Sequence, residues 1–75
     1  MKMISAKDII SEFNISYQTI NNYTDRGFLN VVAKKDRNRM YDYNEVRERL
    51  AKITKLVNEG YALRLIHKML NEGER

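Results

Sequence analysis

The chain has 75 residues, a net charge of +4 and a pI near 9.5, with no cysteine and a single histidine. This length allows one small hydrophobic core, and the residue content excludes disulfides, thiolate metal sites and a histidine cluster. No apolar run could span a bilayer or serve as a signal peptide, so we expect a cytoplasmic protein, and its positive charge favours an anionic partner.

The first predicted element is a helix that begins after Ser5. Asp8 follows three residues later, which is a short form of the capping box that satisfies the first backbone N–H groups of a helix. Apolar side chains then recur at helical spacing and should form one buried stripe. They are Ala6, Ile9, Ile10 and Phe13. Asn14 suits the left-handed turn that ends such a helix.

A second helix is predicted from about Tyr17 to about Arg26. Ser16 is a favourable N-cap, and Gly27 is a favourable residue just past the C-terminal end. Only two residues, Asn14 and Ile15, separate this helix from the first one. Two short helices joined by so tight a turn are typical of a helix-turn-helix, which offers its second helix to DNA.

The outer face of this second helix is rich in amides. Gln18, Asn21 and Asn22 lie on it beside Tyr17, whereas the opposite face carries another set of side chains. That set is Thr19, Ile20, Tyr23 and Thr24. Asparagine is a poor helix former, but Asn and Gln can make paired hydrogen bonds to adenine in the major groove. The helix alone fits two interpretations equally, a DNA-reading surface or an ordinary polar face.

A β-hairpin is predicted next, with strands near residues 31–34 and 39–42 around a polar turn. Residues 30–42 hold four basic and two acidic side chains, and residues 34–39 within them are the densest positive stretch of the chain. Taken alone, such a loop tip is more often simply a solvated surface. Phe28, Leu29 and Tyr41 are expected to be core residues under the hairpin.

Two further helices complete the predicted order. Asn44 is expected to cap the third helix, which buries Val46, Leu50, Ile53 and Val57 and ends at Gly60. The fourth helix should bury Leu63, Ile66 and Leu70, with Met69 beside them and His67 at the edge. The predicted fold class is therefore mainly α with a small β-hairpin, in one domain over residues 1–75. No catalytic or phosphate-loop motif is present, so we expect neither an enzyme nor a cofactor.

The sequence resembles the winged helix-turn-helix DNA-binding domain of the MerR family from about Ile4 to Leu70. The family pattern Ser-x-x-Thr-Leu-Arg-Tyr-Tyr-Glu-x-x-Gly-Leu is matched in outline from Ser16 to Phe28. Its wing pattern Tyr-Arg-x-Tyr is similar to residues 38–41, and its later Glu-x-Gly-Phe-Ser-Leu-x-x-Ile pattern to residues 58–66. Asn21, Asn22 and Thr24 depart from it, where the family usually has Arg, Tyr and Glu.

The resemblance implies sequence-specific binding of double-stranded DNA by a transcription regulator. The second helix would enter the major groove, Thr19 and Tyr23 would reach phosphates from its side, and the wing would contact flanking phosphates. The candidate DNA-binding residues are Ser16, Tyr17, Gln18, Thr19, Asn21, Asn22, Tyr23, Lys34, Lys35, Arg37 and Arg39. Family members continue into a long dimerisation helix, and no helix of that length is predicted after Gly60. We therefore expect the isolated chain to be monomeric, with dimerisation left to sequence missing here. The resemblance also implies nucleoid association, without metal or membrane.

Two alternatives stay open. The same fold could serve an architectural factor, as in excisionase-like proteins or the DNA-binding end of a chromosome or plasmid segregation protein. A protein-interaction module is the alternative from another class, because tyrosines are enriched at interfaces. Its contact surface would be formed by Tyr17, Tyr23, Tyr41, Tyr43 and Tyr61.

Overall fold

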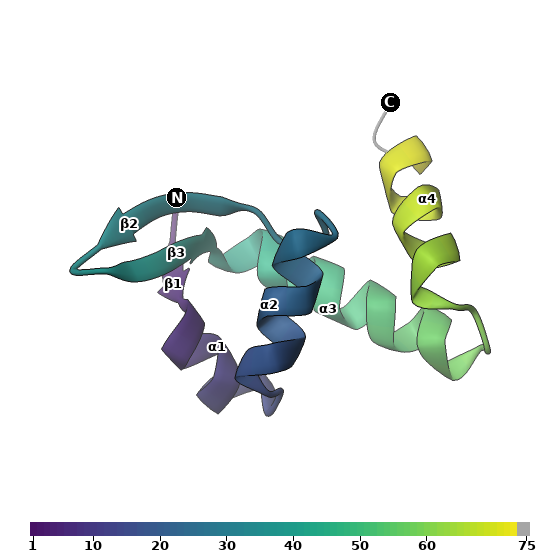
Figure 1. Cartoon of the computed structure of the whole chain (residues 1–75), viewed down its shortest axis with the longest axis horizontal. Helices are drawn as coiled ribbons and strands as arrows, with labels where there is room; N and C mark the ends of the chain where they lie inside the picture. The colour runs from purple at the N-terminus through teal and green to yellow at the C-terminus, as the bar shows by residue number, and fades with distance from the viewer. Residues whose placement is uncertain (74–75) are drawn as a thin grey trace.

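A computed structural model of the chain describes the backbone of residues 1–73 and the side chains of residues 1–70 (Figure 1). Residues 74–75 of the expected domain lie outside this description. The elements in order are β1 (Met3–Ser5), α1 (Ala6–Phe13), α2 (Tyr17–Asp25), β2 (Val31–Lys35), β3 (Asn38–Asp42), α3 (Tyr43–Asn58) and α4 (Leu63–Gly73). The fold class is confirmed: the structure is mainly helical with a small antiparallel sheet, in the order of a winged helix-turn-helix.

Strand β1 was not expected from the sequence. It pairs antiparallel with β3, with Ile4 opposite Tyr41, and gives the sheet the order β1-β3-β2. The N–H of Tyr43 also donates to the carbonyl of Lys2 at 2.8 Å. A strand of three residues is too short to show a period, and its partner lies far along the chain. The N-terminal segment is therefore tied to the base of the wing.

The helix-turn-helix has the predicted local signals. The Ser5 hydroxyl accepts from the Asp8 N–H at 3.1 Å, and Asn14 ends α1 in the left-handed region with φ of 54°. The Ser16 hydroxyl then accepts from the Thr19 N–H at 3.0 Å at the start of α2. Each of these bonds satisfies a backbone group that a helix end leaves unpaired.

Helix α2 ends in a Schellman motif. The Phe28 N–H donates to the Tyr23 carbonyl at 2.8 Å, and the Gly27 N–H donates to the Thr24 carbonyl at 3.1 Å. Gly27 has φ of +83°, a conformation that side chains other than glycine rarely adopt. The motif turns the chain inward, so that Phe28 and Leu29 are both fully buried, as expected.

The hairpin β2–β3 forms the wing and extends away from the helices in Figure 1. Asp36 and Arg37 occupy its turn with φ of 51° and 70°, the two positive values that a type I′ turn requires. The pairing shifts between Val31 and Ala33, which leaves Val32 as an extra residue in a bulge. Every residue of β2 is exposed, whereas Tyr41 in β3 is fully buried.

Two expectations for α3 were wrong. The N-cap is Asp42, whose carboxylate accepts from the Asn44 N–H at 3.1 Å, because β3 passes directly into the helix without an intervening loop. Val57 is 45% exposed, and Leu56 is buried in its place. Both positions lie about one helical turn beyond Ile53, and α4 folds back over the Leu56 side, where the Tyr61 N–H donates to the Leu56 carbonyl.

The core consists of two clusters. The first joins the sheet, α1, α2 and the first half of α3, and contains Ile4, Ala6, Ile9, Ile20, Leu29, Tyr41, Val46 and Leu50. The second joins α4 to the second half of α3, and contains Phe28, Ile53, Leu56, Ile66 and Leu70. Tyr23 packs against both clusters. The two clusters together hold α2 firmly against the rest of the chain while its opposite face stays open.

Candidate nucleic-acid interface

The outer face of α2 carries the three amide side chains predicted to lie there, Gln18, Asn21 and Asn22. Gln18 and Asn22 are exposed, and Tyr17 is 56% exposed at the border of this face. The Asn22 Oδ1 accepts a hydrogen bond from Arg26 Nε at 2.8 Å, which leaves the Asn22 NH₂ group as a donor. This face can therefore offer several uncharged hydrogen-bonding groups to a ligand.

Ser16 and Thr19 lie together at the start of α2. Their hydroxyl oxygens are 2.8 Å apart, and the Ser16 oxygen also caps the helix. Ser16 is exposed and Thr19 is half-buried. Both hydroxyl groups therefore already take part in capping α2, and a contact with DNA would have to form in addition to these bonds.

Tyr23 faces inward rather than outward. Its ring packs edge-on against Phe28, with 5.5 Å between ring centroids. Burial raises the pKa of the Tyr23 hydroxyl above its ordinary value of 10.0. The ring belongs to the packing between the two core clusters, and a contact of this residue with phosphate stays a prediction.

The cations of the wing fall into two groups. Lys34, Lys35 and Arg37 are exposed on β2 and on the turn. Arg39 on β3 is half-buried instead, and it lies against α2. Its guanidinium is 5.5 Å from the ring centroid of Tyr17 and 6.0 Å from that of Tyr41.

Arg39 also connects the two parts of the candidate site. Its Nη2 donates a hydrogen bond to the Oδ1 of Asn21, so the amide-rich helix and the basic wing meet through these two side chains. The residues lie 18 positions apart in the chain. Nothing in the periodicity of either segment indicates this pairing.

A hollow between α1, the start of α2 and the wing adds one residue that sequence reasoning missed. Lys7 lines this hollow together with Tyr17, Arg37 and Arg39, and no acidic side chain lines it. A hollow with three cations suits an anionic group such as a DNA phosphate. On the sequence Lys7 is an ordinary residue on the solvent side of a helix, and only the fold brings it to the wing.

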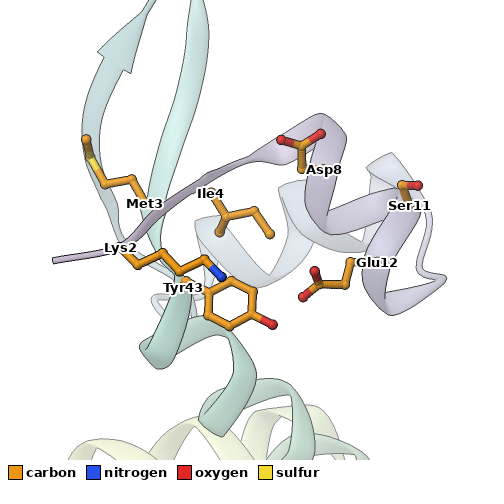
Figure 2. Close-up of a pocket in the computed structure, with 7 residues that line it drawn as sticks. All are labelled: Lys2, Met3, Ile4, Asp8, Ser11, Glu12 and Tyr43. Carbon is orange, nitrogen blue, oxygen red and sulfur yellow. The ribbon is translucent and has the colours of Figure 1, made fainter.

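A second hollow, formed by β1, α1 and the start of α3, has mixed charge (Figure 2). Lys2 Nζ lies 4.2 Å from the ring centroid of Tyr43, and Asp8 and Glu12 also line the hollow. A hydrogen bond with Glu12 raises the pKa of Tyr43. The two carboxylates would repel phosphate, so this hollow is less suited to an anionic group than the one beside the wing.

The tyrosines do not form a common surface. Tyr41 is fully buried, Tyr23 lies between the core clusters, and Tyr43 lines the mixed-charge hollow. Tyr17 is the first residue of α2, whereas Tyr61 lies in the loop between α3 and α4. The structure therefore contradicts the tyrosine contact surface on which the protein-interaction alternative depended.

A tight helix-turn-helix with a basic hairpin beside its second helix defines the winged helix-turn-helix class of DNA-binding domains. The sequence model of the family described as "MerR HTH family regulatory protein" matches residues 4–73, and the chain belongs to this family. It is a DNA-binding domain of the kind that serves transcription regulation. No curated protein and no solved structure matches the chain significantly. None of the helices in residues 1–73 has the length and apolar content that a membrane crossing requires.

Proposed function

We propose that the chain binds a specific site on double-stranded DNA, with α2 in the major groove and the wing on the flanking phosphates. Gln18, Asn21 and Asn22 would face base edges, while Lys34, Lys35 and Arg37 would neutralise phosphates. The protein would act in the cytoplasm, on the nucleoid, as a regulator of transcription without catalytic activity.

One observation supports this docking above the others. The uncharged amide face of α2 and the cationic wing adjoin each other at the Asn21–Arg39 contact, and Lys7 extends the cationic side. Base edges in the major groove require neutral donors and acceptors, and the phosphates on either side require cations. The neutral amide face of α2 with cations beside it therefore corresponds to the base edges of a groove with phosphates beside them.

Selection of bound duplexes from a random pool tests the proposal, followed by affinity measurements at several salt concentrations. Gln18→Ala should cost about 1–3 kcal/mol on the selected duplex and little on an unrelated one, because a base contact carries discrimination. Its salt slope should not change. Arg37→Ala should weaken binding to both duplexes and lower the slope of log K against log salt by about one.

The opposite pattern would reverse the proposed docking. If Arg37→Ala changes sequence preference while Gln18→Ala changes only the slope, the wing reads the bases. If the unmodified chain retains no duplex at low salt, DNA is not the partner of this surface.

We propose further that the isolated chain is monomeric and binds one half-site weakly. α4 turns Ile66 and Leu70 into the core, but Leu65 and Met69, which lie four residues apart, form a partly exposed apolar row on another side of it. Sedimentation at micromolar protein should show a monomer. A dimer that Leu65→Lys dissociates would refute the proposal and place the contact on this row.

A further inference from the structure

Asn21 is the one amide of the α2 outer face that contacts the wing in the described part of the chain. Its Oδ1 accepts from the Arg39 guanidinium, and Asn21 makes no other side-chain hydrogen bond among residues 1–70. Bonds from a charged donor are about twice as strong as neutral ones. The Asn21 side chain is therefore oriented by this contact, with its oxygen toward the wing and its NH₂ group available.

Arg39 is itself held in place. The rings of Tyr17 and Tyr41 lie 5.5 and 6.0 Å from its guanidinium, and the side chain is half-buried. Tyr41 is fully buried and cannot shift easily. The exposed Lys34, Lys35 and Arg37 have no comparable support. Arg39 thus differs from the other wing cations, whose side chains are exposed and make no ring or hydrogen-bond contact within residues 1–70.

We infer that Arg39 positions Asn21 for sequence readout and so makes Asn21 select guanine over adenine. The inference rests on the proposed docking of α2. The paired contact of an asparagine with adenine uses both its oxygen and its NH₂ group, because adenine presents one acceptor and one donor in the major groove. With its oxygen directed to Arg39, Asn21 turns its two NH₂ hydrogens away from the wing, and guanine offers the acceptors N7 and O6 to receive them. The paired contact with adenine would require a second hydrogen bond to the oxygen that Arg39 already holds.

This role is different from a phosphate contact. A cation that only neutralises phosphate weakens all duplexes equally when it is removed. A residue that orients a base-reading amide instead affects discrimination at one base pair. Lysine keeps the charge of arginine but lacks its planar fork of donors and its stacking on rings. Arg39→Lys therefore separates the two roles.

The experiment measures dissociation constants for the selected duplex and its single-base variants. Asn21→Ala first identifies the base pair that Asn21 reads, as the pair at which discrimination falls on the order of tenfold to a hundredfold. Arg39→Lys should lose discrimination at that same pair while keeping the salt slope. Adding Arg39→Lys to Asn21→Ala should cause no further loss there. Arg37→Lys is the matched control and should keep discrimination at every pair.

A readout on the free protein separates failure of the inference from failure of the proposed function. The NMR signals of the Asn21 NH₂ group should shift in Arg39→Lys and stay unchanged in Arg37→Lys, with both variants melting near the parent temperature. If no duplex is preferred although this shift is present, the proposed docking has failed and the base-reading role fails with it. The inference alone is overturned if a duplex is preferred but Arg39→Lys discriminates like the parent, or if the pair read by Asn21 carries adenine.

Discussion

Thr24 has a structural role between α2 and the wing. Its hydroxyl lies 2.7 Å from the Ile20 carbonyl and 2.9 Å from the Tyr41 hydroxyl. A hydroxyl has one hydrogen, and a carbonyl can only accept, so Thr24 donates to Ile20 and the buried Tyr41 donates to Thr24. Thr24 thus has an interior partner, and this bond fastens α2 to the wing near the Asn21–Arg39 contact.

Because Tyr41 donates to Thr24 and Thr24 donates to Ile20, two substitutions should lower the unfolding free energy by different amounts. Tyr41→Phe removes a donor and should lower the unfolding free energy by about 1 kcal/mol. Thr24→Val should cost more, up to about 3 kcal/mol, because the Tyr41 hydroxyl is left buried without an acceptor. Urea unfolding of both variants and of the double variant gives the comparison. A larger loss in Tyr41→Phe would contradict the assignment.

Tyr23 gives the fold a dependence on alkaline pH. Its pKa is raised by burial above the ordinary 10.0, so the neutral form is favoured in the folded state. The contribution of Tyr23 to the unfolding free energy is fully present below the pKa that it has in the unfolded chain, about 10. This contribution is lost as the pH rises from there through the higher pKa of the folded state. Melting temperatures between pH 9 and 11 should fall less for Tyr23→Phe than for the parent. Equal slopes would show that Tyr23 does not contribute.

At the scale of elements, the wing turn places two residues other than glycine at positive φ. Asn-Gly is the pair that a type I′ turn favours, and left-handed residues other than glycine each cost on the order of 1 kcal/mol. Asp36→Asn combined with Arg37→Gly should therefore raise the unfolding free energy by about 1 kcal/mol. Asp36→Asn combined with Arg37→Ala is the matched control, because it removes the same two charges but keeps a residue other than glycine at the second position with positive φ. If the control raises the unfolding free energy by the same amount, the effect comes from the loss of charge and not from relief of backbone strain.

The elements that the sequence predicts well are those fixed by neighbours in the chain. Ser5, Ser16 and Gly27 mark helix ends through bonds to residues three positions away, and Asn14 does so through its left-handed backbone. The sequence predicts all four. Strand β1, the Asp42 cap and the burial of Leu56 depend on where distant segments pack, which no local pattern contains.

The same distinction applies to the candidate site. The amides of α2 and the cations of the wing are visible in the sequence, because each set lies within one element. The Asn21–Arg39 contact and the approach of Lys7 to the wing need the folded chain. The sequence pattern therefore identifies most residues of the candidate surface, but it does not show that the amides of α2 contact the cations of the wing.

At the scale of the whole molecule, the two core clusters predict two levels of local stability. Ile66→Ala and Ile20→Ala each remove a fully buried side chain and should each cost roughly 2–5 kcal/mol. Hydrogen exchange should show the difference between them. Ile66→Ala should speed exchange in α4 far more than in α1 and α2, whereas Ile20→Ala should speed exchange in α1 and α2. Uniform acceleration in both variants would mean that the clusters unfold together.

Helix α3 connects these two clusters and also continues directly from the wing, because Asp42 is both the last residue of β3 and the N-cap of α3. With 16 residues it is about 24 Å long. No loop separates β3 from α3 at Asp42. A tilt of α3 by about 5° relative to β3 would therefore displace the far end of α3 by about 2 Å, given that length. A movement of α4 by that distance together with α3 would therefore require only a small rotation of α3 at the base of the wing.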